Sequence, residues 1–272
     1  MVQFITIDDP TDLRVAGYAQ VRERDLVGRH GLFMAEGEVV VRMLATSRLC
    51  EPVSLLLAQK RVEALSDSLA ALAPEVPVYV AGQAVMDALV GFPIHRGILA
   101  LGRRRATPTA CEILAGLGPE ALILVLYGIG NHDNMGGLFR NAAAFGADAV
   151  LLDADCCDPL YRKAIRVSVG ASLITPFARL ERDEDLAGLL EAAGVRSVAL
   201  SPAGQGTLAQ LSRAPRMAVL LGSEGPGLPA DVLARTRTVA IPMAAGFDSL
   251  NVATTAGIVL HHLGFMAERE AG

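Results

Sequence analysis

The pattern of apolar and polar positions is clearest in the second half of the chain. Residues 121–127 form a continuous apolar run, which is typical of a strand buried on both faces of a parallel sheet. Similar short runs predict four further strands, at residues 149–152, 195–200, 217–221 and 239–242. A helix is expected through residues 139–145, and a long, mostly apolar helix over residues 249–267, with Asp248 or Ser249 as its cap. The alternation predicts an open parallel α/β sheet with ligands at the carboxyl ends of its strands.

The first half has shorter elements. Its pattern predicts helices at residues 39–44 and 60–72, and strands at residues 53–57, 76–80 and 98–101. This alternation is typical of a small α/β sandwich. A polar, turn-rich stretch at residues 103–119 separates the two halves. We therefore expect a small domain over residues 1–107, a linker over 108–119 and a larger domain over 120–272.

Composition narrows the class of protein. The chain is 52% apolar and contains no tryptophan, so its core must consist of aliphatic side chains. The chain begins without the basic and apolar segments of a secretory signal, and its apolar runs are much shorter than the roughly 18 residues of a membrane helix. Its cysteines, Cys50, Cys111, Cys156 and Cys157, show neither zinc spacing nor a disulfide framework. We expect a cytoplasmic protein with no membrane span and no metal.

The net charge of -5 argues mildly against a nucleic-acid partner, but the charge is unevenly distributed. Residues 1–107 carry 12 acidic and 12 basic side chains, whereas residues 108–272 carry 17 and 12. If the protein binds RNA, the first segment is therefore the better electrostatic candidate. Apart from Lys60 and Lys163 every basic side chain is arginine, which contacts phosphate in a bidentate manner. Genome base composition explains the arginine content equally well.

The first of three polar loops spans residues 128–140 and follows the expected strand 121–127. It lacks the third glycine of a dinucleotide-binding fingerprint. Its pattern Asn134-x-Gly136-x-x-x-Arg140 lies at the strand-to-helix junction, where Gly136 is expected to allow a close turn. Arg140, in the first turns of the helix, offers a guanidinium group to a phosphate or carboxylate. A surface ion pair is the alternative for a single arginine.

Two more loops follow buried runs. Residues 221–228 contain three glycines around Glu224, which expose backbone groups to a ligand, although a tight turn also explains them. Residues 241–252 end in Ser249 and Asn251 at the start of the last apolar helix. Helix capping explains one of these two polar residues but does not readily explain both.

The three loops, in this order and spacing, resemble the signature motifs of the SpoU (TrmH-type) family of SPOUT RNA methyltransferases. The matching positions are Asn134, Gly136 and Arg140, residues 222–228, residues 241–243, residues 249–252, and the Ser168-Val-Gly170-Ala171 segment between the first two motifs. Residues 33–38, with Glu36-Gly37-Glu38, resemble an L30e-like RNA-binding domain that many family members carry. The glutamate-glycine pair is also explained as a simple strand-to-helix turn.

This resemblance implies an α/β fold with a C-terminal trefoil knot and a small N-terminal L30e-like domain. In such a knot S-adenosylmethionine (AdoMet) is held largely by backbone groups. The corresponding positions here are Leu221, Gly222, Ile241, Met243 and Leu250. The resemblance also implies a homodimer whose active site is completed across the interface. The expected reaction is methyl transfer to a ribose 2'-hydroxyl of rRNA or tRNA, and the additional N-terminal domain favours rRNA.

The resemblance assigns catalytic roles to five residues. Arg140 is expected to bind an RNA phosphate, and Asn134 to orient the loop and the ribose. Glu224 is expected to fix the second motif or an arginine, while Ser249 and Asn251 position AdoMet and the third loop. No metal is required, because the cofactor supplies the leaving group.

Several positions depart from the usual family pattern, namely Asn131-His132, Asn141, Ala253 and His261-His262. None of them removes an expected catalytic residue. Two alternative functions stay open: a SPOUT enzyme that methylates a base, and a non-catalytic RNA-binding or ribosome-assembly factor. Arg140 together with Ser249 and Asn251 favours ribose over base methylation, and the presence of Glu224, Arg140 and Asn251 together argues against a non-catalytic factor.

Overall fold

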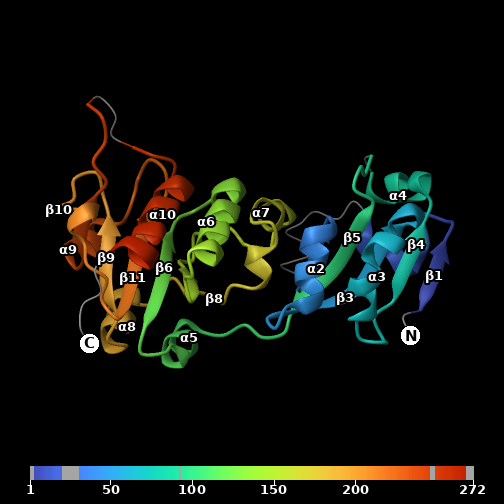
Figure 1. The fold of residues 1–272 in the computed structure, drawn as a ribbon, viewed down its shortest axis with the longest axis horizontal. Coiled ribbons are helices and arrows are strands. Elements are labelled where there is room, and N and C mark those ends of the chain that lie inside the picture. The colour runs from blue at the N-terminus through green and yellow to red at the C-terminus, as the bar shows by residue number, and fades with distance from the viewer. Residues whose placement is uncertain (1–2, 20–30, 92, 246–248, 268–272) are drawn as a thin grey trace. The chain divides into compact units, whose positions relative to one another are not determined.

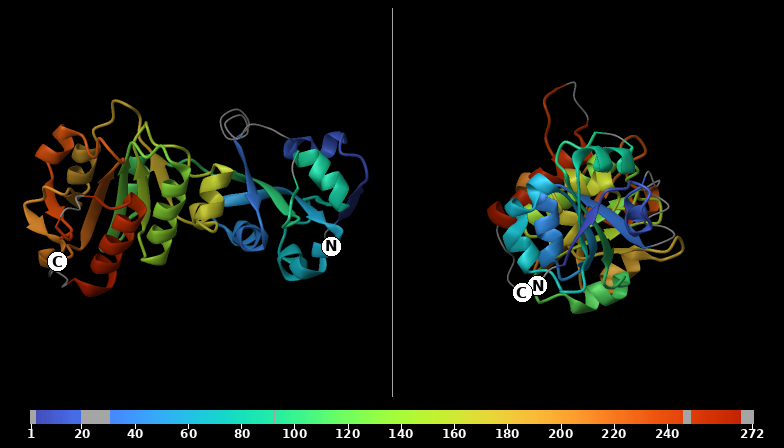
Figure 2. Two further views of the ribbon diagram at one scale, coloured as in Figure 1. Left: turned by 90° about the horizontal axis from the view of Figure 1, so that it is seen from above. Right: turned by 90° about the vertical axis from the view of Figure 1, so that its right-hand side faces the viewer.

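The computed structural model describes residues 3–19, 31–91, 93–245 and 249–267 (Figures 1 and 2). The chain divides into two compact units. The first unit comprises residues 1–106 together with residues 160–174, and the second comprises residues 107–159 and 175–272. The first boundary lies next to the one predicted from sequence. The assignment of residues 160–174 to the first unit was not predicted, because contacts distant in sequence determine it.

The first unit is built on a five-stranded mixed sheet (Figure 1). Its strands lie in the order β1 (Phe4–Ile7), β4 (Val78–Ala81), β3 (Cys50–Ala58), β5 (Ile98–Arg104) and β2 (Leu32–Glu36). The neighbours β1, β4 and β3 are parallel, whereas β5 runs antiparallel to both β3 and β2. The three strands predicted in this half are confirmed, and β1 and β2 are additional.

The helices of the first unit are α2 (Glu38–Thr46), α3 (Ser66–Ala70), α4 (Gln83–Val90) and α7 (Arg162–Val167), with 3-10 turns at Leu13–Tyr18, Gln59–Arg61, Glu63–Leu65 and Ala171–Leu173. Helix α2 confirms the prediction at residues 39–44. The helical stretch predicted over residues 60–72 is confirmed in part, because the chain forms two 3-10 turns and then α3, which ends at Ala70. The Arg42 side chain donates a 2.8 Å hydrogen bond to the carbonyl oxygen of Ala64. A side chain from α2 therefore binds a backbone acceptor within this segment.

The second unit contains a seven-stranded sheet in which all neighbouring strands are parallel. The order is β10 (Gly206–Thr207), β12 (Arg237–Ala240), β9 (Arg196–Leu200), β11 (Arg216–Gly222), β6 (Ala121–Tyr127), β7 (Ala149–Leu152) and β8 (Phe177–Arg179). Residues 121–126 have no exposed surface, as predicted for a strand covered on both faces. The predicted open parallel sheet is confirmed.

Helices cover both faces of this sheet. Helices α5 (Ala110–Gly116), α8 (Leu186–Ala192) and α9 (Ala230–Ala234) share one apolar core with alternate residues of β6 and β11. Helices α6 (His132–Ala144) and α10 (Val252–His261) lie side by side (Figures 1 and 2). No helix of the described ranges has both the length and the apolar character needed to span a membrane.

Three helices begin at residues that differ from the prediction, and at each of them a capping residue marks the observed start. The expected linker 108–119 contains α5, whose start is closed by a capping box of Thr109 and Glu112. Helix α6 begins at His132, capped by Asn131, so Asn134 and Gly136 lie within the helix and Gly136 makes no turn. Helix α10 is capped by Asn251 rather than Ser249, and it gives way to a π-helical turn at His262–Met266. Asp248, the other predicted cap, lies outside the described residues.

Candidate active site

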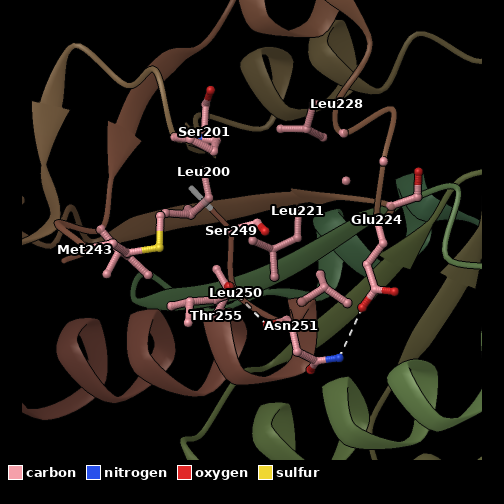
Figure 3. Close-up of a pocket in the computed structure, with 17 residues that line it drawn as sticks. Leu200, Ser201, Leu221, Glu224, Leu228, Met243, Ser249, Leu250, Asn251 and Thr255 are labelled. Atoms are coloured by element: carbon pink, nitrogen blue, oxygen red, sulfur yellow. Dashed lines mark hydrogen bonds between the residues drawn. The ribbon is translucent and has the colours of Figure 1, made fainter. Parts of the chain in front are cut away.

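The segments that follow β9, β11 and β12 enclose a pocket of about 540 Å³ at the carboxyl ends of these strands (Figure 3). Its lining consists of residues 200–202, 221–225, 227–228, Ile241, Met243, 249–252 and Thr255. Figure 3 shows Met243 at one side of the pocket and Glu224 at the other, with Leu221, Ser249 and Leu250 between them. The pocket therefore lies where the parallel sheet predicts a ligand site.

All five residues predicted to bind the cofactor line this pocket. They are Leu221, Gly222, Ile241, Met243 and Leu250. The sequence interpretation missed the wall formed by Leu200, Ser201 and Pro202, which follows β9, and by Thr255 of α10. The only signal for the first of these was a Ser-Pro pair directly after a predicted strand.

Glycine is required at position 222 by a close approach of two backbone segments. A Cβ atom at Gly222 would lie 2.2 Å from the carbonyl carbon of Gly227 and 2.4 Å from the amide nitrogen of Leu228. The loop between them turns at Gly225 and Gly227, which have positive φ angles of 91° and 72°. Because these residues carry no side chain, the loop presents its backbone to the pocket.

One residue from each sequence motif joins a hydrogen-bonded triangle. The Nδ2 atom of Asn134 donates to Oε1 of Glu224 over 3.0 Å. The Nδ2 atom of Asn251 donates to the same carboxylate oxygen over 3.1 Å and to Oδ1 of Asn134 over 2.8 Å. Asn134 is buried, whereas Glu224 is exposed at the pocket. The structure thus brings together three of the five predicted catalytic residues.

Asn251 serves the fold and the triangle at the same time. Its Oδ1 atom accepts hydrogen bonds from the backbone N–H groups of Ala253 and Thr254, which caps helix α10. Its Nδ2 atom makes the two bonds of the triangle. Both ends of this amide are therefore engaged, which fixes its orientation. One oxygen of Glu224, Oε2, makes no hydrogen bond with the described residues.

The other two predicted catalytic residues lie apart from the triangle. Ser249 lines the pocket and is exposed. Arg140 lies on the exposed surface of α6 and does not line the pocket. In the part of the chain that the structure describes, Arg140 has no hydrogen bond and no ion pair. Its guanidinium group is therefore available to an external anion.

The close packing of α6 on α10 holds the triangle in place. A Cβ atom at Gly137 would lie 2.8 Å from the Cβ atom of Ala253, so the helices meet at small residues. The Nδ2 atom of Asn141 donates to the Ala253 carbonyl over 2.6 Å. Asn141 and Ala253 are two of the departures from the family pattern, and the structure shows that they contact each other.

Tyr127, at the end of β6, is a further titratable side chain close to this edge of the sheet. Its burial, followed by the negative charge of Asp153, raises the pKa of Tyr127 to about 12. The phenol is therefore neutral at physiological pH and does not act as a base there. No group of acidic, histidine or cysteine side chains among the described residues has the arrangement of a metal site.

The pocket suits a nucleoside cofactor such as AdoMet. Its volume is within the range of small-molecule sites, and aliphatic side chains from Leu200, Leu221, Ile241 and Leu250 form much of its wall. The glycine-rich loop after β11 adds backbone groups without side-chain obstruction. These features provide an apolar surface for a base and polar groups for the rest of the molecule.

Comparison with known proteins agrees with this description. The model of the SpoU rRNA methylase family matches residues 121–261. A Mycobacterium bovis protein described as an uncharacterised tRNA/rRNA methyltransferase is 37% identical over 273 residues, which cover 94% of this chain and 92% of that protein.

Solved structures share the fold along nearly the whole chain. The AdoMet-bound rRNA methyltransferase of Sinorhizobium meliloti matches with a TM-score of 0.78 and 23% identity, and covers 94% of this chain and 96% of that one. A structure described as an RNA 2'-O ribose methyltransferase matches with a TM-score of 0.72 and 25% identity, and covers 94% of this chain and 97% of that one. The chain therefore belongs to the SpoU rRNA methylase family of RNA methyltransferases, as its three motifs predict.

Proposed function

We propose that this protein transfers a methyl group from AdoMet to a ribose 2'-hydroxyl of RNA, with rRNA favoured over tRNA. The observation that carries this proposal is the triangle of Asn134, Glu224 and Asn251 at the pocket. It places a carboxylate held by two amides beside a cavity suited to a nucleoside cofactor. The similarity to an RNA 2'-O ribose methyltransferase and the family description as rRNA methylases support the choice of substrate.

The predicted cofactor residues would hold AdoMet in the pocket. The AdoMet-bound neighbour from Sinorhizobium meliloti supports AdoMet as the cofactor. When bound, AdoMet supplies an electrophilic methyl group on a sulfonium. Leu221, Ile241 and Leu250 contribute apolar surface, and Gly222 allows the loop after β11 to approach closely. The residues of the chain then have to bind the RNA, align its hydroxyl and accept a proton.

Glu224 is the candidate proton acceptor. A ribose hydroxyl attacks a methyl group effectively only if a nearby group takes its proton. Arginine is unsuitable for this role, because its side chain stays protonated at any physiological pH. The two amides hold Glu224 through Oε1, and Oε2 is left to accept the proton of the 2'-hydroxyl. This extends the role that the family resemblance suggests for Glu224.

Arg140 is the candidate phosphate-binding residue. It lies on α6, the helix that carries Asn134, and has no partner among the described residues. A guanidinium group binds phosphate through two parallel hydrogen bonds, which fixes orientation as well as position. Ser249 and Asn251 would position the cofactor and the third loop. A phosphate held by Arg140 would fix the adjoining ribose relative to Glu224.

An exposed apolar surface on the second unit supports a homodimer as the oligomeric state. Large apolar side chains at the end of α10 and beyond it are exposed, with Phe265 and Met266 each 67% exposed and Ile258 40%. Phe145 and His261 pack edge to face beside them. A homodimer would bury this surface, and RNA as the substrate suits a cytoplasmic location. We retain the trefoil knot and the RNA-binding, L30e-like first unit as parts of the same proposal.

The proposal is tested with the purified protein, AdoMet carrying a tritiated methyl group, and total RNA from cells that lack the gene. After digestion to nucleosides, we expect the label in one 2'-O-methyl nucleoside. Label in a methylated base would instead show a base methyltransferase. AdoMet binding without transfer to any RNA fraction would indicate a non-catalytic RNA-binding factor.

A further inference from the structure

A second pocket lies entirely within the first unit, at the start of helix α2. It has a volume of about 420 Å³ and is lined by residues 36–40, Arg61, Arg96, Ile98, Arg166 and Val169. Its residues come from four separate stretches of sequence, including the segment 160–174. Glu36-Gly37-Glu38 is the stretch that the sequence alone explains as a strand-to-helix turn.

The acidic residues of this pocket already have cationic partners. Glu36 accepts two hydrogen bonds from Arg162, from Nη2 over 2.9 Å and from Nε over 3.1 Å. Glu38 accepts two from Arg42, over 2.9 Å and 3.1 Å. Neither Arg42 nor Arg162 lines the pocket. The carboxylates are therefore neutralised by arginines outside the lining.

The three arginines that do line the pocket have no such partner. The side chains of Arg61, Arg96 and Arg166 make no hydrogen bond or ion pair with any residue in the described ranges. The Nε–H of Arg61 is buried and lacks an acceptor there. Buried donors are almost always paired in folded proteins, so an unpaired one in a pocket indicates a missing acceptor. Three uncompensated positive charges indicate that this acceptor is anionic.

Helix α2 adds to the positive character of the pocket. Its first turn has backbone N–H groups without partners inside the helix, and its cap Gly37 makes no side-chain hydrogen bond. Gly37 has a φ of 94°, and a Cβ atom there would lie 2.9 Å from Nη1 of Arg96. A glycine at this position thus lets the Arg96 guanidinium group lie against the start of the helix.

We infer that this pocket is a phosphate-binding site, and that the phosphate belongs to the backbone of the RNA substrate. A phosphate matches both the fork geometry of arginine and the N–H groups of a helix start. The assignment to RNA rests on the proposed function, whereas the phosphate chemistry rests on the pocket alone. At this site Arg166, from the segment 160–174, would contact RNA together with residues of the N-terminal part of the chain.

The test uses three single variants, Arg61→Gln, Arg96→Gln and Arg166→Gln, and the triple variant, all in the full chain. Arg48→Gln is the matched control, because Arg48 is an exposed arginine of the same unit just beyond the other end of α2. The probe is a fluorescent single-stranded RNA of 20 nucleotides, since phosphate binding does not depend on sequence. AdoMet affinity is measured for every variant and is expected to be unchanged, which verifies folding of the second unit.

We expect the RNA dissociation constant of the triple variant to rise by about tenfold at low salt. The slope of log K against log salt should become shallower by about 0.7 for each RNA phosphate that the variant no longer binds. Arg48→Gln should keep the affinity and slope of the wild type. Equal RNA affinity and slope in the wild type and the triple variant would overturn the assignment to RNA, and so would an equal loss of affinity in the control.

A second measurement separates the phosphate site from the proposed function. Pyrophosphate at constant ionic strength should raise the melting temperature of the wild type but not that of the triple variant. If only this difference is seen, the pocket binds a free phosphate compound and its assignment to RNA is overturned. If neither RNA nor pyrophosphate distinguishes the two proteins, there is no phosphate site. A wild type that binds pyrophosphate but no RNA would count against the proposed function and leave the phosphate site standing.

Discussion

Asn251 donates a 2.8 Å hydrogen bond to Asn134, although the two residues lie 117 positions apart in the sequence. The bond joins the cap of α10 to the first turn of α6, and Glu224 closes the triangle from the loop after β11. The three sequence motifs therefore meet at a single carboxylate. Substitutions at four positions test what each part of this site contributes.

Two variants of Asn251 separate its capping role from its role in the triangle. Asn251→Asp keeps an oxygen that caps α10 but places a second carboxylate beside Glu224 and removes the Nδ2 donor. We expect stability close to that of the wild type and a strong loss of methyl transfer. Asn251→Ala should lose about 1 kcal/mol of stability as well. Urea unfolding and methyl-transfer rates measure both effects, and an active Asp variant would rule out a role for the Nδ2 donor.

A variant of Glu224 tests its role as the proton acceptor. Glu224→Gln keeps an oxygen for the two asparagine amides but removes the free carboxylate oxygen. We expect methyl transfer to fall by roughly 10²- to 10⁴-fold, while the dissociation constant of AdoMet changes little. Glu181→Gln, at an exposed carboxylate of the same unit outside the pocket, is the control and should remain active. Transfer at the wild-type rate by Glu224→Gln would assign the proton to another acceptor.

A variant of Arg140 tests its role as the ligand of an RNA phosphate. Arg140→Ala should abolish methyl transfer and leave AdoMet affinity largely intact, because Arg140 does not line the pocket. Stability should change by no more than about 0.5 kcal/mol, since the side chain is exposed and makes no bond among the described residues. Single-turnover rates and calorimetric titration with AdoMet check these expectations. Normal methylation by the variant would contradict the assigned role.

A variant of Gly222 tests the glycine-rich loop. In Gly222→Ala the new Cβ atom would lie 2.2 Å from the Gly227 carbonyl carbon, so the backbone has to move. We expect weaker AdoMet binding and a lower melting temperature. Gly116→Ala is the control, because nothing lies within 4 Å of a Cβ atom there. An unchanged AdoMet affinity in Gly222→Ala would show that the close approach of the two backbone segments is not needed for the pocket.

The sequence predicted the second unit better than the first for a physical reason. In residues 121–127 and in the later strands, the buried residues are consecutive in the sequence. The parallel sheet, and the edge at which it binds ligands, could therefore be predicted. The five residues that the motifs predict as cofactor ligands all line one pocket, and their role there stays a prediction. Helix starts were predicted less well. The helix expected through residues 139–145 begins at His132, after its cap Asn131, and α10 is capped by Asn251 rather than Ser249.

Long-range interactions account for what the sequence did not reveal. The ion pair of Arg162 with Glu36 and the 2.6 Å hydrogen bond from Ser47 to the Leu173 carbonyl each join residues 126 positions apart. They attach the segment 160–174 to the first unit, and no local pattern encodes them. The arginine pocket at α2 depends on the same packing, since Arg166 and Val169 come from this segment.

The measurement that tests the central claim most directly maps 2'-O-methylated riboses across total RNA from cells with and without the gene. Our account predicts that a defined ribose methylation, in rRNA by preference, disappears in the cells without the gene and returns when the wild-type chain is restored. Restoration with Glu224→Gln should leave the site unmethylated. An unchanged ribose map in the absence of the gene would contradict the assignment of this chain as a ribose methyltransferase.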